Sequence, residues 1–385
     1  MTTQSALLAF VAGAVGENPS FPALSSLDGK ALCSLARSHD VAHLVAEGIR
    51  KSGQKIEDEE IKRAYEKASD IAFGRDAIFS NFEPMVCQTL KDAGIPHVLM
   101  KGAVLRKLYP ESRLRLSRDM DLLVREEDLE KAVTALEKIG FTTDRVRKFH
   151  ELPLCFGDSF RLDLHFSIEE NQRSMDAILK EVWDHTEPVE EFTYRETGTF
   201  FLFHHVAHMC HHFMRGGCGI KPFLDLDLLL ARHDYDEKEL FSMLERSGMK
   251  TFFEEACALS RVWFGGASHT DLTRDMEQFV LNGLAFGSMH NHDAVRAIRK
   301  KGKLSTLFSL VFPPYSQMCT VYPVLIRKKR LLPICYLRRL FSKLFGKGSD
   351  RARQHTKIIL GQSEDTVAST AKLFDRLGLS ELDQV

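Results

Sequence analysis

The chain has 385 residues, of which 44% are hydrophobic and 27% charged, an ordinary composition for a folded protein with a large core. The formal net charge of −1 excludes a uniformly basic nucleic-acid-binding protein and leaves electrostatic recognition to local patches. No apolar run is long enough to span a bilayer, the eight cysteines include no CxxC pair, and the apolar N-terminus lacks a basic leader, so we expect a cytoplasmic protein.

Residues 1–93 are predicted to form an N-terminal helical region. Apolar residues recur at helical spacing, and Pro84 is the expected break or kink in a long amphipathic stretch, unless it lies in the first turn of a helix. His39, Asp40 and His43 lie between two predicted helices, and we interpret them as a partly exposed helix connection rather than a metal site.

Residues 94–195 are predicted to form a core with a small mixed sheet. HVLMKG and DMDLLV are expected strands separated by the short helix AVLRKLY, and REEDLEKAVTALEKIG is an expected helix ending at its glycine. FTTDRV, ELPLCFG and SFRLDLHFSI are further expected strands. The last of these alternates apolar and polar residues, which is typical of a half-buried strand.

Two more helical regions complete the predicted organisation. Residues 196–300 contain a histidine-rich helix, TFFLFHHVAHMCHHFM, and the helix FLDLDLLLARHD beyond the loop RGGCGIKP. Residues 301–385 form a basic C-terminal helical region, in which residues 327–353 interleave basic and apolar side chains. A solvated helix face is the simpler interpretation of that segment, and weak contact with an anionic surface is the alternative. The predicted fold class is α+β, with helical regions on both sides of the sheet.

The candidate site centres on Asp119 and Asp121, which lie two residues apart on a predicted strand and therefore share one face. Two carboxylates on one partly buried face repel each other and lose solvation, and a divalent cation such as Mg²⁺ relieves both costs. Asp163 has matching alternation on a later strand and is the candidate third carboxylate. A cluster of this kind holds one or two metal ions for phosphoryl chemistry.

Positive and flexible groups surround these carboxylates. Gly102 and Ala103 follow a predicted strand and open a helix, so their backbone amides are candidate phosphate donors, with Lys101 adding charge. Arg113, Arg115 and Arg118 precede Asp119, and one of them is expected to bind a triphosphate.

Histidines offer a competing site. His208 and His212 share a helix face at a spacing that suits zinc, but no H-E-x-x-H glutamate accompanies them. We therefore expect this helix to pack beside the cleft, with His208 or His212 contacting Asp225 or substrate. His165 shares the face of Asp163, and two interpretations stay open: a donor to a carboxylate, or a half-exposed strand histidine.

The arrangement of strand, turn, helix and D-x-D strand resembles the polymerase-beta-like nucleotidyltransferase superfamily. It is more similar to a bacterial family of uncharacterised nucleotidyltransferases, in which a "lKG" turn replaces the usual Gly-Ser. The matching segments are Leu99–Gly102, Arg115 four residues before the first aspartate, Asp119–Val124, Leu162–Phe166, Ala207–His212 and Phe223–Leu226. Because the serine that contacts phosphate is absent, backbone amides around Gly102, with Lys101, are the expected substitute.

The resemblance implies transfer of a nucleoside monophosphate from an NTP, ATP among them, to an acceptor, with Mg²⁺ or Mn²⁺ as cofactor and release of pyrophosphate. It implies metal binding by Asp119 and Asp121, completion of the site and acceptor activation by Asp163, and phosphate contacts by Arg115. His208, His212 and Asp225 would shape the pocket for an acceptor, which is a small molecule, a protein or an RNA. Two alternatives are a non-catalytic nucleotide-binding or interaction protein with the same fold, and a metal-dependent phosphohydrolase built on the histidine-rich helix.

Overall fold

The structure is a computed structural model of the chain. It describes residues 2–16, 20–147, 150–232, 234–285, 287–288, 291–292, 294–295, 298, 312–313, 315–322, 324–345 and 364–382. His233 and residues 346–353, the end of the basic segment 327–353, lie outside the described residues. No helix in the described part of the chain has the length and apolarity needed to cross a membrane.

The N-terminal region is helical, as predicted. It comprises α1 (Thr3–Val15), α2 (Gly29–Ser38), α3 (Ala42–Ser52) and the 34-residue α4 (Glu59–Asp92). The expected break at Pro84 is wrong, because α4 continues through it. Proline removes one backbone hydrogen bond, but Phe79, Val86 and Leu90 on either side are buried in a common core, and their burial outweighs that loss.

Six strands form one mixed sheet in the order β3-β4-β2-β1-β6-β5. Their bounds are β1 (His97–Leu99), β2 (Met120–Val124), β3 (Glu151–Phe156), β4 (Phe160–His165), β5 (Thr186–Glu190) and β6 (Thr193–Glu196). The central strand β2 pairs antiparallel with β1 and parallel with β4. This confirms the predicted α+β class with a small mixed sheet. The expected strand at FTTDRV is wrong, since only Thr142 makes an isolated bridge there, to Cys155.

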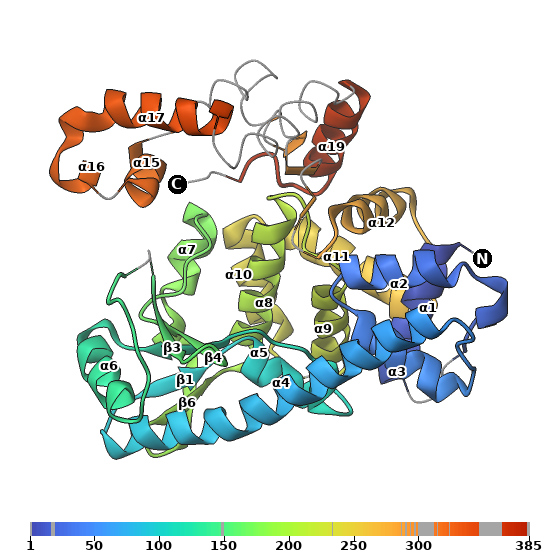
Figure 1. The fold of residues 1–385 in the computed structure, drawn as a ribbon, viewed down its shortest axis with the longest axis horizontal. Coiled ribbons are helices and arrows are strands. Elements are labelled where there is room, and N and C mark those ends of the chain that lie inside the picture. The colour runs from blue at the N-terminus through green and yellow to red at the C-terminus, as the bar shows by residue number, and fades with distance from the viewer. Residues whose placement is uncertain are drawn as a thin grey trace.

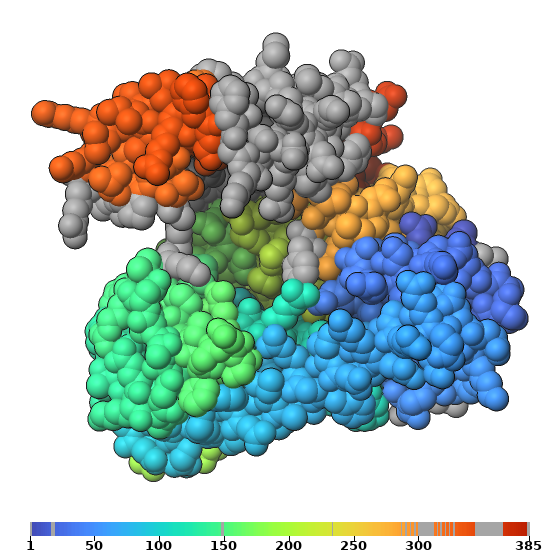
Figure 2. Space-filling model, in the orientation of Figure 1, coloured from blue at the N-terminus to red at the C-terminus, as the bar shows by residue number. Residues whose placement is uncertain are grey.

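The two faces of the sheet have different surroundings. Leu122 and Leu164 belong to a core shared with α4 and α6 (Leu129–Lys138), so this face is covered by these two helices. In Figure 1, α4 runs along one side of the sheet, and in Figure 2 its residues form a light-blue band across the lower part of the molecule. Because side chains alternate, Asp121 and Asp163 lie on the other face.

The helices after the sheet share an apolar core with Val98 and Leu123 of that second face. They are α7 (Arg173–Leu179), α8 (Gly198–Phe213), α9 (Lys221–Leu230), α10 (Glu237–Ser247), α11 (Lys250–Phe264) and α12 (Asp271–Gly283). They share a large apolar core with α1–α3, and Figure 1 shows α8 and α9 between the sheet and the N-terminal helices. The last described helices are α15 (Tyr315–Val321), α16 (Val324–Arg327), α17 (Leu332–Phe345) and α19 (Glu364–Arg376).

Candidate functional site

The parallel pairing of β2 with β4 brings two predicted carboxylates into register. Asp121 lies directly opposite Asp163, and Asp119 precedes β2 with the buried Met120 between it and Asp121. Burial, reinforced by the charges of Asp121 and Asp163, raises the pKa of Asp119. Negative charge is therefore crowded at this edge of the sheet, as a cation-binding site requires.

Lys101 provides the nearest positive charge to Asp121. Its Nζ atom lies 3.7 Å from Asp121 Oδ1, and His165 Nε2 lies 2.9 Å from the same oxygen. Burial alone would raise the pKa of Asp121, but Lys101, His165 and His208 outweigh it, so this pKa lies below its ordinary value and Asp121 is a carboxylate. The contact favours the interpretation of His165 as a donor to a carboxylate.

The turn that holds Lys101 is strained. Lys101 has φ 41° and ψ −113°, a conformation that disfavours side chains and costs about 1–3 kcal/mol. It precedes the four-residue helix α5 (Gly102–Leu105), and a Cβ atom at Gly102 would lie 2.5 Å from Ser117 Oγ. A side chain at 102 would therefore displace Ser117 in the 115–118 loop. The amide of Ala103 donates to the Met100 carbonyl at 3.2 Å, which reduces its availability to a phosphate.

Asp163 is already engaged. Its Oδ1 accepts a hydrogen bond from Arg161 Nε at 2.8 Å, and Arg161 Nη2 lies 2.8 Å from the same oxygen. The side chain is buried and does not line the cavity described next. Asp163 is thus beside Asp121 as expected, but its charge is balanced by an arginine.

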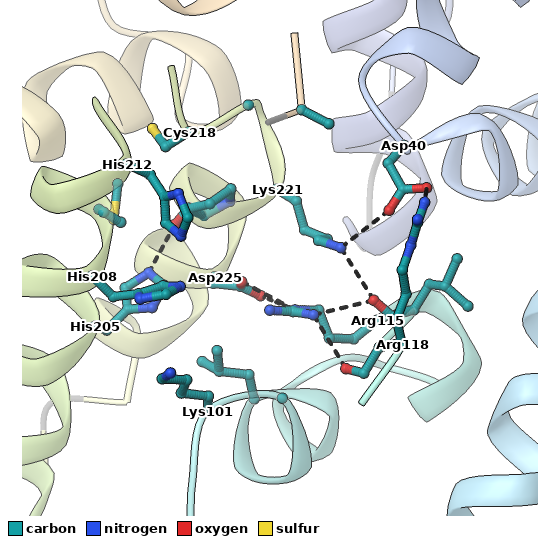
Figure 3. A pocket seen from close by; sticks show the side chains of 18 of the residues that line it. Asp40, Lys101, Arg115, Arg118, His205, His208, His212, Cys218, Lys221 and Asp225 are labelled. Atoms are coloured by element: carbon teal, nitrogen blue, oxygen red, sulfur yellow. Dashed lines mark hydrogen bonds and ion pairs between the residues drawn. The ribbon is translucent and has the colours of Figure 1, made fainter. Parts of the chain in front are cut away.

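Eight of the eleven predicted site residues line a single cavity of about 240 Å³: Lys101, Gly102, Arg115, Asp119, Asp121, His208, His212 and Asp225. The volume is near the lower end of the roughly 300–1,000 Å³ common for small-molecule sites. Figure 3 shows Lys101 and the α8 histidines on one side of this cavity, with Lys221, Asp40 and Arg118 on the other. The exceptions are Ala103, Asp163 and His165.

Arg115 is anchored inside the protein. Its Nε donates to Asp225 Oδ1 at 2.8 Å, and its Nη1 donates to the Leu116 carbonyl and to Ser117 Oγ. Asp225 has no exposed surface and also accepts a hydrogen bond from Tyr109 at 2.8 Å. Burial opposes ionisation of Asp225, but Arg115 outweighs it and lowers the pKa of Asp225, so the pair is ionic.

The opposite wall contains residues that sequence reasoning did not select. Asp40, at the turn between α2 and α3, lies 3.6 Å from Lys221 and accepts from Arg118 at 3.0 Å. Figure 3 shows Lys221 reaching towards Asp40, and its Nζ also donates to the Leu116 carbonyl at 3.1 Å. Burial and the charge of Arg115 lower the pKa of Lys221 to about 8. The interpretation of His39 and His43 as partly exposed is wrong, since both are buried.

The α8 histidines are mostly committed to protein partners. His204 Nδ1 lies 3.1 Å from buried Glu196, and His205 Nε2 lies 2.9 Å from the Pro222 carbonyl. His208 Nδ1 lies 2.7 Å from Glu170 Oε1, and the side chain of His208 is 33% exposed and lines the cavity. Burial and the neighbouring His208 lower the pKa of His212 to about 3, so His212 is neutral.

Potential metal ligands gather at a different place. Within the described part of the chain, the group of three side chains whose ligand atoms lie within 4.8 Å of one another is His150, Glu151 and His165, not the three aspartates. No such group forms among the described α8 histidines. Burial is the main cause that lowers the pKa of His150 to about 4, so its imidazole is neutral.

Comparison with known families decides the class of protein. A family model described as "Uncharacterised nucleotidyltransferase" matches residues 25–265, well over half of the chain. The chain belongs to this family. No curated protein and no solved structure matches this chain.

The match to the uncharacterised nucleotidyltransferase family confirms the resemblance predicted from the sequence motifs. It runs from α2 to α11 and so includes the sheet, the 97–124 motif and the α8 and α9 walls of the cavity. Membership supports nucleotidyl transfer as the general activity.

Proposed function

We propose that this nucleotidyltransferase moves a nucleoside monophosphate from a metal-bound NTP to an acceptor. The acceptor oxygen or nitrogen forms a bond to the α-phosphorus, the bond from that phosphorus to the bridging oxygen breaks, and pyrophosphate leaves. The observation that carries the proposal is the pair Asp119 and Asp121, directed from β2 towards a cavity that also contains Lys101.

The side chains present fit a divalent cation. The crowding that raises the pKa of Asp119 would be relieved by a cation held between Asp119 and Asp121. Such an ion, when bound, neutralises phosphate charge and orients the reacting oxygens. Asp163 remains the predicted third carboxylate, although its bonds to Arg161 make it a weaker donor than the other two.

Two further roles belong to the proposal. Lys101 would bind a phosphate of the nucleotide, because its ammonium lies in the same cavity as both aspartates. His208 would accept the proton of the acceptor nucleophile. Burial would raise the pKa of Glu170, but the contact with His208 outweighs burial and lowers this pKa, so Glu170 is a carboxylate. The carboxylate accepts a hydrogen bond from Nδ1–H of His208, and Nε2 of His208 is then the basic nitrogen.

The test uses NTPs labelled at the α- or the γ-phosphate, with Mg²⁺ or Mn²⁺ and cell extract as the source of acceptor. We expect α-label in a product and γ-label in pyrophosphate, both lost in Asp119→Asn and Asp121→Asn. Asp158→Asn, on the exposed turn between β3 and β4, is the matched control and should behave like the wild type.

Other outcomes separate the alternatives. Release of free γ-labelled phosphate that needs His208 but not Asp119 would identify a phosphohydrolase. Nucleotide binding without turnover in any extract would identify a non-catalytic binding protein. Label transfer that survives both aspartate substitutions would contradict the proposed site.

A further inference from the structure

A second group of potential ligands lies on the same face of the sheet as Asp121. His150 directly precedes β3, Glu151 begins that strand, and His165 ends the neighbouring strand β4. Glu151 and His165 are direct cross-strand partners in the antiparallel pair. Each of the three side chains offers a ligand atom, and these atoms lie within 4.8 Å of one another.

The hydrogen bond of His165 defines its protonation pattern. Its Nε2 lies 2.9 Å from Asp121 Oδ1, and a carboxylate can only accept, so Nε2 carries the proton. In a neutral imidazole Nδ1 is then the accepting nitrogen. Only 2% of His165 is exposed, and its Nδ1 has no hydrogen-bond partner among the residues that the structure describes. A buried acceptor left unsatisfied costs about 1–3 kcal/mol, which a bound cation would recover.

His150 has the same unsatisfied atom. Its Nδ1 is buried and has no hydrogen-bond partner within the described ranges. The rings of His150 and His165 are neighbours, with centroids 5.4 Å apart and planes inclined by 17°. Two adjacent imidazoles, each with an unsatisfied ring nitrogen, match the ligand chemistry of a transition metal.

Glu151 supplies the anionic ligand. Its two carboxylate oxygens face different groups: Oε1 lies 3.7 Å from Arg161 Nη2, and Oε2 lies 3.8 Å from His165 Nε2. The carboxylate therefore lies beside His165 and can supply an oxygen to an ion that the imidazoles bind.

We propose that His150, Glu151 and His165 bind one divalent transition-metal ion such as Zn²⁺, at a site separate from the cation site proposed between Asp119 and Asp121. Two imidazoles and one carboxylate are a common ligand set for zinc, whereas Mg²⁺ prefers oxygen ligands alone. Asp121 would not bind this ion. It would accept a hydrogen bond from Nε2–H of His165 and so fix the orientation of the ring, as carboxylates beside metal-bound histidines commonly do.

The experiment measures metal binding without nucleotide, so its result is independent of the proposed transfer reaction. The full chain is stripped with chelator and titrated with Co²⁺, which reports histidine and carboxylate ligands through its visible spectrum and thiolate ligands through a separate charge-transfer band. We expect one equivalent of Co²⁺ with no thiolate band, displaced by Zn²⁺.

Variants locate the site. His150→Ala and Glu151→Gln alter partly exposed residues and should each weaken Co²⁺ binding at least tenfold while retaining the wild-type circular dichroism spectrum. Asp119→Asn should bind Co²⁺ like the wild type. His269→Ala is the matched control, because His269 Nε2 lies 3.6 Å from Glu277 but belongs to no described three-ligand group.

Two results would overturn the proposal. One is binding that survives His150→Ala and disappears in Asp119→Asn, which would place the ion at the aspartates. The other is a titration of the wild type that shows no stoichiometric binding, or only the thiolate band.

Discussion

The buried ion pair between Arg115 and Asp225 provides a direct test of what Arg115 does. The sequence motif predicts a phosphate ligand, whereas the structure shows the guanidinium bonded to Asp225 and to the 115–118 loop. Arg115→Met removes the charge and keeps most of the apolar stem. It leaves a fully buried carboxylate with Tyr109 as its remaining close donor.

The expected loss of stability follows from this burial. Removing one partner of a buried ion pair destabilises a protein by about 3–5 kcal/mol, because the other charge stays uncompensated. Arg118→Met is the control: the side chain of Arg118 is 62% exposed, and exposed ion pairs contribute about 1 kcal/mol or less. Urea unfolding followed by circular dichroism measures both changes.

A compensated variant separates charge from shape. The triple change Arg115→Met, Asp225→Leu and Tyr109→Phe removes the ion pair together with the tyrosine hydroxyl that bonds to it, and we expect it to recover most of the loss, since no buried charge is left uncompensated. The reasoning would be refuted if Arg115→Met cost less than about 1 kcal/mol and instead sharply weakened NTP binding. That outcome would make Arg115 a phosphate ligand rather than a structural anchor.

Four further predictions concern the turn, the acceptor side and the core. Gly102→Ala should destabilise the protein, because its Cβ would lie 2.5 Å from Ser117 Oγ, and Ser117→Gly should largely restore the melting temperature. Lys101→Gly should be more stable than Lys101→Ala by about 1 kcal/mol or more. Both variants lack the charge, and only glycine adopts the positive φ without strain. Equal melting temperatures of the two variants would argue against a strained turn. His208→Asn should slow label transfer at least tenfold with little change in NTP affinity, as expected for loss of a general base; a change in NTP affinity alone would contradict that role. Burial, with smaller contributions from the charges of Lys221 and Arg115, lowers the pKa of His43 in the folded protein to about 4. As the pH falls below 6.5, His43 therefore takes up a proton in the unfolded protein while it is still neutral in the folded protein. Unfolding free energy should therefore decrease from pH 6.5 to 4, by up to about 1.4 kcal/mol per pH unit for this group, and His43→Gln should flatten that slope in urea titrations at several pH values.

The parts of the site that could be predicted from the sequence depend on residues close together in the chain, or on the alternation of side chains along a strand. Asp119 and Asp121 share a face because they are two residues apart, and Asp163 lies opposite Asp121 because β4 has the same alternation. Register between the strands follows from burying Leu122 and Leu164 on the helix-covered face.

The missed parts depend on contacts between distant segments. Asp40 and Lys221 are far apart in the chain, and no local pattern predicts that the α2–α3 turn meets the start of α9. The edge strand β5 was not predicted, because its sequence TEPVE combines a proline with two charged residues and its last three residues are exposed. Arg161 shares the face of Asp163 because the two residues are two apart, but alternation alone does not show that the arginine bonds to that carboxylate.

The position of Lys101 links these observations into one electrostatic argument. Burial opposes its charge, but Asp121, Glu170, Asp119 and Glu151 outweigh burial and raise its pKa. A single ammonium thus faces several carboxylates, and their charge exceeds its own. A metal–nucleotide complex brings the missing positive charge to the carboxylates and negative charge to the lysine. In the proposed reaction Lys101 would therefore exchange Asp121 for a phosphate as the complex binds. The strained backbone at Lys101 is consistent with this role, because it holds the lysine at a turn that lies beside Asp121 of β2 and lines the cavity.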